Sequence, residues 1–285
     1  MKKLLLLLLL CGSFNIFSQK TETKTDSIPK RLSIMGKYTF LFNQSSFSNW
    51  AAGGNNTIAG NIAIEYDFNY KKNNWNWDNK VTTNYGLSHI SEKGLRKTDD
   101  NFEYNSILGL KTSKHWFVSF FTNLKTQYSR GYEYKNDIKT PISDFFSPAY
   151  WSFGPGMLWK KSDNQRINIA PATARYTFVS DEFSGKYGVK ENRNTNFSLG
   201  FNLSAYYKKE IMTNIEMENI LTIYTDYLKN LRNIDVNYQF NLFVKINKYI
   251  STNLGLHIII DDDASSKIQF KEVFGLGVNY TFHQK

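Results

Sequence analysis

Residues 234–246 read IDVNYQFNLFVKI, and every second residue of this stretch is apolar. The apolar positions are Ile234, Val236, Tyr238, Phe240, Leu242, Val244 and Ile246, and the residues between them are polar, with Phe243 the single exception. Successive side chains of a β-strand point to opposite faces, so this pattern predicts a strand with one apolar and one polar face. Such a strand suits either a soluble sandwich or a membrane barrel.

The same alternation recurs along nearly the whole chain. Twelve such runs begin near residues 33, 57, 75, 101, 115, 149, 166, 195, 211, 233, 249 and 267. A tilted transmembrane strand needs roughly 9 to 11 residues, and each run is long enough. Helical spacing is not sustained after the amino-terminal segment. We therefore expect an all-β fold, an antiparallel transmembrane β-barrel of about 12 strands over residues 33–285, although roughly 10 to 14 strands fit the spacing.

The lengths of the connections between these runs favour a membrane barrel over a sandwich. The connections are long after the first, third, fifth and seventh runs, for example ISEKGLRKTDD after the third and DEFSGKYGVKENRN after the seventh, and short after the second, fourth, sixth, eighth and tenth: KKNN, SK, KSDNQ, KKE and NK. Outer-membrane barrels have short periplasmic turns and longer extracellular loops, whereas a sandwich has no reason to sort its loops by parity. An even number of strands also brings both ends of the barrel to the periplasmic side.

The amino terminus, MKKLLLLLLLCGSFNIFSQK, has the layout of a secretory signal peptide, with two lysines, a leucine run and a small residue before Gln19. We expect residues 1–18 to be cleaved and residues 19–32 to form a polar periplasmic tail or linker. Cys11 would leave with the signal; its alternative use as a lipidated cysteine is disfavoured by Leu10 before it. No other cysteine is present, so the mature chain has neither disulfides nor thiolate chemistry.

The composition and the net charge of the chain indicate which partners it can bind. The chain carries 18 Tyr and 22 Phe, which suits strands and interfacial aromatic belts. No later segment approaches the roughly 18 consecutive apolar residues of a transmembrane helix. The formal charge of +10 would favour nucleic acid in a cytoplasmic protein, but export makes anionic lipid or lipopolysaccharide the expected partner, and no nucleic acid.

The last run contains a pattern of glycine, aromatic and terminal hydrophobic residues in Gly277, Tyr280 and Phe282. It is similar to the assembly signal by which the barrel-assembly machinery captures the final strand of outer-membrane proteins. The match departs from the usual form because His283, Gln284 and Lys285 follow Phe282.

Longer segments carry a family resemblance. SFSNWAAGGNN, GLRKTDDNFEYNS, LKTQYSRGYEY, ISDFFSPAYW, NIDVNYQ, INKYIS, IIIDDD and IQFKEVFGLGVNY, spread from Phe42 to Phe282, resemble the recurring segments of a Bacteroidota outer-membrane β-barrel family catalogued as domain of unknown function 3078. The resemblance implies the outer membrane of a Gram-negative envelope. It implies no activity and no catalytic residue.

The register places a set of charged residues on the lumen face, with both signs in similar numbers. These lumen-facing candidates are Lys37, Glu65, Asp67, Lys80, Glu103, Lys111, Lys125, Glu216, Glu218, Asp235, Lys245 and Lys271. A twelve-stranded barrel lies between the packed eight-stranded and the open sixteen-stranded sizes. We expect a narrow or partly plugged pore whose charges pair across the lumen, or a structural barrel that these charges only solvate.

The loops offer three further candidates. Their cations, such as Arg130 and Arg193, could bind lipopolysaccharide phosphates. Asp261–Asp263 lack the alternating ligands and the glycine of a calcium loop, so we expect no metal and no other cofactor. SFSNWAAGGNN places Trp50 beside small residues, and we expect it to fold back into the barrel mouth as a plug, although an interfacial tryptophan is the common alternative.

An enzyme would have to act from the rim. His89 ends the third run while Asp99 and Asp100 precede the fourth, an arrangement that faintly resembles the omptin proteases, and aspartates could raise the basicity of the histidine. No nucleophile, zinc or phosphate-loop motif is present. The sequence therefore favours a non-enzymatic outer-membrane barrel, a narrow pore for small solutes or an envelope structural protein. The alternatives are a rim hydrolase, acting as a protease or phospholipase, and a surface-binding barrel for lipopolysaccharide.

Overall fold

The computed structural model describes residues 31–46, 55–135, 138–229 and 233–284. The predicted signal peptide, residues 1–18, and nearly all of the predicted tail, residues 19–32, therefore lie outside the described residues, as does Trp50 with its proposed plug. Within the described ranges, no helix is long and apolar enough to cross a membrane.

The described chain is almost entirely β-strand. The strands are β1 (Leu32–Ser45), β2 (Thr57–Lys72), β3 (Trp75–Ile90), β4 (Gly94–Lys111), β5 (Trp116–Thr126), β6 (Gly131–Lys135), β7 (Ile138–Ser143), β8 (Ala149–Ser162), β9 (Gln165–Phe178), β10 (Thr195–Met212), β11 (Ile215–Asp226), β12 (Ile234–Lys245), β13 (Ile250–Asp261) and β14 (Ser265–Gln284). A short 3-10 helix, η1 (Asp181–Phe183), lies between β9 and β10.

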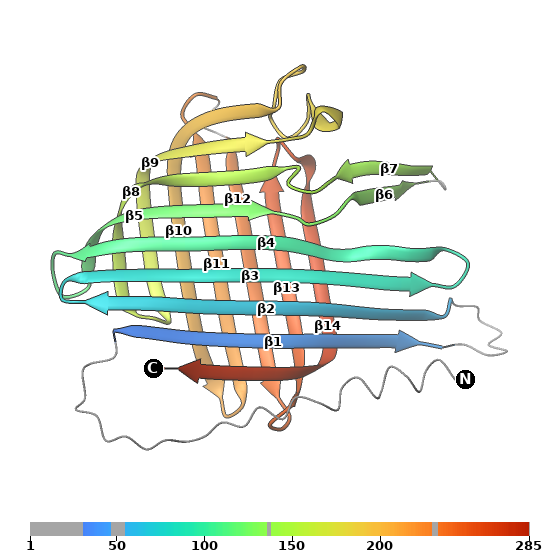
Figure 1. The fold of residues 1–285 in the computed structure, drawn as a ribbon, viewed down its shortest axis with the longest axis horizontal. Coiled ribbons are helices and arrows are strands. Elements are labelled where there is room, and N and C mark those ends of the chain that lie inside the picture. The colour runs from blue at the N-terminus through green and yellow to red at the C-terminus, as the bar shows by residue number, and fades with distance from the viewer. Residues whose placement is uncertain (1–30, 47–54, 136–137, 230–232, 285) are drawn as a thin grey trace. The chain divides into compact units, whose positions relative to one another are not determined.

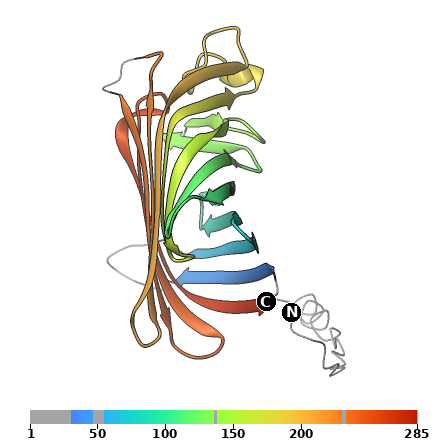
Figure 2. The same ribbon diagram turned by 90° about the vertical axis from the view of Figure 1, so that its left-hand side faces the viewer.

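Twelve of these strands form one closed antiparallel barrel, in the order β1-β14-β13-β12-β11-β10-β9-β8-β5-β4-β3-β2. The predicted fold class and strand number are thus confirmed. In Figure 1, β1 to β5 run across the picture and β11 to β13 run up and down behind them. Strands tilted from the barrel axis cross in this way when they are seen through both walls, and Figure 2 separates the two walls.

The two ends of the barrel differ in their connections. One end, here called the turn end, holds the start of β1, the finish of β14 and the brief connections at 73–74, 112–115, 163–164, 213–214 and 246–249. The other, the loop end, holds the connections at 46–56, 91–93, 127–148, 179–194, 227–233 and 262–264. Strands β6 and β7 form a separate hairpin within the segment 127–148, which the sequence pattern did not predict.

Two predicted connections are wrong in detail. The segment ISEKGLRKTDD, predicted to be a long loop, is mostly strand, because β3 and β4 continue to a tight turn at 91–93. Outside the apolar band both faces of a strand are polar, so the alternation disappears while the backbone pairing persists. KKE at 208–210 lies within β10, and the turn is at 213–214 instead.

The two faces of the wall have opposite character. The outer face exposes large apolar side chains, among them Phe40 at 46% and Phe274 at 63% of their surface. Five tryptophans lie on this face: Trp75, Trp77, Trp116, Trp151 and Trp159. The buried residues inside the described barrel are mostly polar, including Lys80, Lys160, Asn168 and Glu218. This distribution inverts that of a soluble protein, whose interior is apolar.

Candidate functional site: the barrel lumen

A cluster of charged side chains crosses the middle of the lumen. The Lys80 ammonium on β3 lies 3.1 Å from Glu65 and 3.9 Å from Asp67 on the neighbouring β2, and 3.6 Å from Glu218 on β11. Strands β3 and β11 are opposite each other in the twelve-membered ring. The Lys80–Glu218 pair therefore spans the full width of the barrel.

Side chains of β10 and β12 hold Glu218 in place. The Tyr206 hydroxyl donates a hydrogen bond of 2.8 Å to one carboxylate oxygen of Glu218, and the Asn241 amide donates one of 3.0 Å to the other. The Arg166 guanidinium stacks 4.3 Å from the centre of the Tyr206 ring. A buried carboxylate with a cation and two neutral donors has its charge well compensated, so these contacts hold Glu218 at a defined position in the lumen.

Lys37 extends this cluster and explains the one break in the alternation of β12. Its ammonium lies 3.9 Å from Glu65 and 3.1 Å from the centre of the Phe243 ring. Phe243 shares the inner face with Gln239 and Asn241, so an aromatic residue stands at a lumen position where it forms a cation–π contact.

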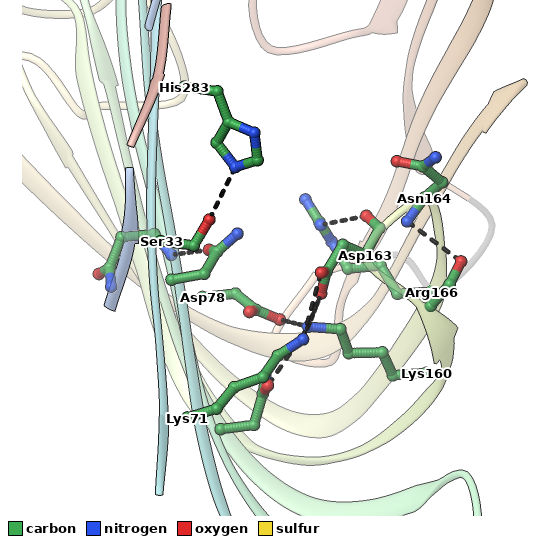
Figure 3. A network of polar contacts seen from close by, with 12 residues as sticks. Ser33, Lys71, Asp78, Lys160, Asp163, Asn164, Arg166 and His283 are labelled. Atoms are coloured by element: carbon green, nitrogen blue, oxygen red, sulfur yellow. Dashed lines mark hydrogen bonds and ion pairs between the residues drawn. The ribbon is translucent and has the colours of Figure 1, made fainter. Parts of the chain in front are cut away.

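A second network of polar contacts lies at the turn end of the lumen (Figure 3). Lys160 on β8 is bound to Asp78 on β3 and lies 2.8 Å from Asp163, which also lies 2.9 Å from Lys71. Asp163 belongs to the turn between β8 and β9. Partial burial tends to raise its pKa, but hydrogen bonds and the charges of Lys160 and Lys71 outweigh burial and lower the pKa to about 2.

Between the central cluster and the loop end the lumen is hollow. This cavity has a volume of about 500 Å³. Charged, amide and hydroxyl side chains dominate its lining, with a few aliphatic ones such as Leu41 and Ile107. The lumen thus contains ion-pair networks at its centre and turn end, and this cavity in its loop-end half.

At the mouth of this cavity, Lys271 on β14 reaches Asp99 on β4 at 2.9 Å. Asp99 also accepts a hydrogen bond of 3.2 Å from the side chain of Asn61. This side chain passes over Gly86. A Cβ atom at Gly86 would lie 2.8 Å from the Asn61 amide nitrogen, so a larger residue there would displace the Asn61 side chain.

The predicted lumen residues fall into three groups according to their position in the structure. Glu65, Lys80, Glu103, Lys125 and Glu218 line the cavity. Asp67 contacts Lys80, Glu216 pairs with Lys208 at 2.8 Å and Asp235 pairs with Arg175. Lys111 and Lys245 lie in the same inward register but are exposed at the turn end.

Sequence reasoning missed several lumen residues that carry contacts. These are Asp78, Lys160, Arg166, Arg175, Tyr206 and Phe243. For Asp78, the inward register of Lys80 two residues later is a sufficient signal. Arg175 follows a shift in the β9–β10 register between Gly200 and Asn202, and simple counting of alternate residues fails across such an irregularity.

The residues of the rim hydrolase alternative do not converge. His89 pairs with Ile58 and Leu95, whose side chains lie on the outer face, while Asp99 lies inside with Asn61. Asp100 accepts hydrogen bonds from the backbone N–H groups of Tyr128 and Ser129, the Ser129 hydroxyl and Lys97, at 2.7 to 2.9 Å. Asp100 therefore fixes the chain that leaves β5.

The other loop-end candidates are largely engaged by neighbours. Asp263 pairs with Lys229 at 2.8 Å, and the described residues contain no group of side chains arranged for a metal ion. Arg130 pairs with Glu182, and with Asp144 at 3.6 Å. The Tyr187 hydroxyl donates to the carbonyl of Ile142, so the loop that contains η1 is joined to the β6–β7 hairpin.

The predicted assembly-signal residues lie at the seam where β14 closes on β1. Phe282 lies opposite Gly36, and a Cβ atom at Gly36 would overlap its ring. The ring also packs against Tyr66 and Tyr38, at centroid distances of 5.6 and 6.3 Å. Gly277 faces inward beside Leu41, and Tyr280 pairs with Tyr38. The seam is therefore a glycine notch filled by an aromatic ring.

Residues 42–132 match the family model described as "Protein of unknown function (DUF3078)". No curated protein matches this chain. Among solved structures, an outer membrane channel from Pseudomonas putida F1 is similar, with 10% identity, coverage of 92% of this chain and 98% of that one, and a TM-score of 0.41. The NanC porin has 11% identity, coverage of 89% and 100%, and a TM-score of 0.41.

Proposed function

We propose that this protein is an outer-membrane barrel that forms a narrow passage for small solutes, closed at rest by the Lys80 cluster. One observation carries the proposal: the polar cavity leads from the loop end to the Lys80–Glu218 pair, which crosses the lumen, and the Lys160–Asp163 pair lies beyond it at the turn end. Opening such a cluster requires only that side chains rearrange, whereas a folded plug domain would have to unfold or leave.

The outer face supports a membrane location. Aromatic and aliphatic side chains exposed around the whole ring would be costly in water but are favourable against lipid. Every backbone edge of the ring is paired with a neighbouring strand, as a bilayer requires. We place the protein in the outer membrane of a Gram-negative bacterium, exported by cleavage of residues 1–18 and inserted by the barrel-assembly machinery, with lipid and lipopolysaccharide around it.

The geometry favours the passage over a rim hydrolase. His89 and Asp99 lie on opposite faces of the wall, and Asp100 already accepts four hydrogen bonds. A general base needs its acceptor free to approach a water or a substrate. A lipopolysaccharide-binding role also has less support, because Arg130 and Lys229 are engaged in ion pairs with neighbouring loops.

The test is conductance in planar lipid bilayers. Lys80→Met removes the cation from between three carboxylates, and their mutual repulsion should open the centre of the lumen and raise the conductance several-fold. Lys111→Met is the matched control, because Lys111 has the inward register but lies at the exposed turn end, away from the cluster. Heat-modifiable migration on gels checks that both variants are folded.

The outcomes distinguish the passage from a structural barrel. A raised conductance in Lys80→Met alone supports a lumen closed by side chains. If wild type and both variants are folded but pass no current, the protein is a closed envelope barrel and the proposal fails.

A further inference from the structure

Amide side chains are the dominant polar groups of the lumen cavity. Nine of its lining residues are asparagine or glutamine, and they come from both walls of the barrel. Two of them, Asn84 on β3 and Asn101 on β4, are direct cross-strand partners on the inner face. Such partners have Cβ atoms about 5 Å apart, so the two amides lie side by side on the cavity wall.

This pair, like Gln239 and Gln269, lacks the hydrogen bonds that hold several other amides of the lumen. Asn61 donates to Asp99, Asn241 donates to Glu218, and Asn123 donates to Asn105 at 2.7 Å. The side chains of Asn84 and Asn101 have no hydrogen-bond partner among the described residues. The cross-strand partner of Asn84 on β2 is Ala63. Its side chain is small, so there is room in front of the pair.

Unpartnered amides have a specific chemistry. Each amide presents a carbonyl that accepts and an NH₂ group that donates. A hydroxyl group likewise donates once and accepts twice, so two adjacent amides match two neighbouring hydroxyls of a polyol. Aliphatic side chains in the same lining, such as Leu41, Ile107 and Val273, suit the C–H faces of the same molecule.

The charges of the cavity give a charged ligand little advantage. Asp99 is paired with Lys271, and Glu218 with Lys80. Glu103 and Lys125 are cross-strand partners of opposite sign. The volume of about 500 Å³ lies within the roughly 300 to 1,000 Å³ of small-molecule pockets.

We propose that the loop-end cavity binds neutral polyhydroxylated solutes of saccharide type, with Asn84 and Asn101 as the hydrogen-bonding platform. The inference rests on the proposed function, of which it names the solute class. Binding is distinct from passage, so the two can be tested separately on the same purified protein.

The binding test uses the folded full-length barrel in detergent. Sucrose is the probe, and polyethylene glycol of the same hydrodynamic size is the comparison, because its chain oxygens accept hydrogen bonds but do not donate them. Saturation-transfer NMR and calorimetric titration should detect sucrose binding to the wild type. The double variant Asn84→Ala/Asn101→Ala should bind sucrose roughly tenfold more weakly, since each lost hydrogen bond removes part of the affinity.

The matched control is Asn69→Ala/Asn76→Ala, two asparagines on β2 and β3 that belong to the same inner face but lie at the turn end, outside the cavity. Weaker sucrose binding in the first double variant alone supports the proposal. Equal weakening in both, equal binding of polyethylene glycol, or no sucrose binding by the wild type overturns it.

Bilayer conductance on the same preparations separates this inference from the proposed function. A barrel that conducts but does not bind sucrose retains the passage and loses the solute class. A barrel that binds sucrose through Asn84 and Asn101 without conducting retains the binding site and loses the passage.

Discussion

The ammonium of Lys37 on β1 lies 3.1 Å from the centre of the Phe243 ring on β12, inside the barrel. Phe243 is the one residue that breaks the alternation of its strand, and this contact gives the break a physical reason. Cation–π interactions reach about 2 kcal/mol when they are desolvated.

Phe243→Leu should therefore lower the free energy of unfolding by about 1 to 2 kcal/mol, because the leucine side chain offers Lys37 no ring. Phe240→Leu is the matched control on the outer face of the same strand, where one apolar side chain replaces another. Urea titration of the barrel in liposomes measures both. Equal losses would show that the contact of Phe243 with Lys37 contributes nothing beyond its bulk.

The assignment of faces predicts an asymmetry along β12. Phe240→Arg should cost roughly 2 to 4 kcal/mol near the membrane midplane, whereas Gln239→Arg, whose side chain lines the cavity, should cost far less. Urea titration of both variants in liposomes measures the two costs. A similar cost at the two positions would refute the facing.

The Gly36 notch predicts a defect specific to barrel closure. Gly36→Ala places a methyl group against the ring of Phe282 and should reduce the yield of folded, heat-modifiable barrel. Gly60→Ala is the control, since its new Cβ atom would lie 3.6 Å from Phe40, an ordinary contact. Phe282→Leu should partly restore folding of the Gly36→Ala protein. A normal yield for Gly36→Ala alone would contradict the notch.

The turn-end network predicts a dependence on acid. The pKa of Asp163 is about 2 in the folded protein, below its ordinary value of 3.8. A lowered folded pKa means that the stabilisation is present above the ordinary value and is lost as the pH falls through about 2. Unfolding curves between pH 5 and about pH 2 should therefore fall less steeply for Asp163→Asn than for the wild type. Identical pH profiles would show that the pairing with Lys160 and Lys71 does not stabilise the barrel.

The hydrogen bonds of Asp100 predict that its substitution loosens a loop without changing the lumen. Asp100→Ala removes the acceptor of two backbone N–H groups at Tyr128 and Ser129, so limited proteolysis should cut the segment 127–148 faster. Conductance should stay unchanged, as it should for His89→Ala on the outer face. Peptide or phospholipid hydrolysis lost with either substitution would instead revive the rim hydrolase.

The strands could be predicted from the sequence because the alternation of faces is local: it needs only the order of residues along one strand. The β6–β7 hairpin and the continuation of β4 through Gly94–Asp100 could not, because both lie beyond the apolar band, where a strand shows no contrast between its faces. The connection at 213–214 was misplaced for the same reason.

The lumen charges were predicted as a set, but their partners were not. That Lys80 meets Glu218 depends on the position of β11 opposite β3 and on the stagger of the closed ring, which is a property of twelve strands together. The roles proposed for Asn84 and Asn101 could not be predicted either, because an amide on a polar face looks the same in the sequence whether or not its hydrogen bonds are satisfied.

The outward position of the tryptophans determines what their intrinsic fluorescence can report about this protein. Trp75, Trp77, Trp116, Trp151 and Trp159 all belong to the outer face, so brominated acyl chains should quench most of the intrinsic emission once the barrel has inserted. The same emission is insensitive to the lumen, because none of these five indoles lines the cavity. Spectroscopy of the native chain can therefore time insertion, whereas events inside the barrel require a reporter dye attached at an inward position such as Thr82.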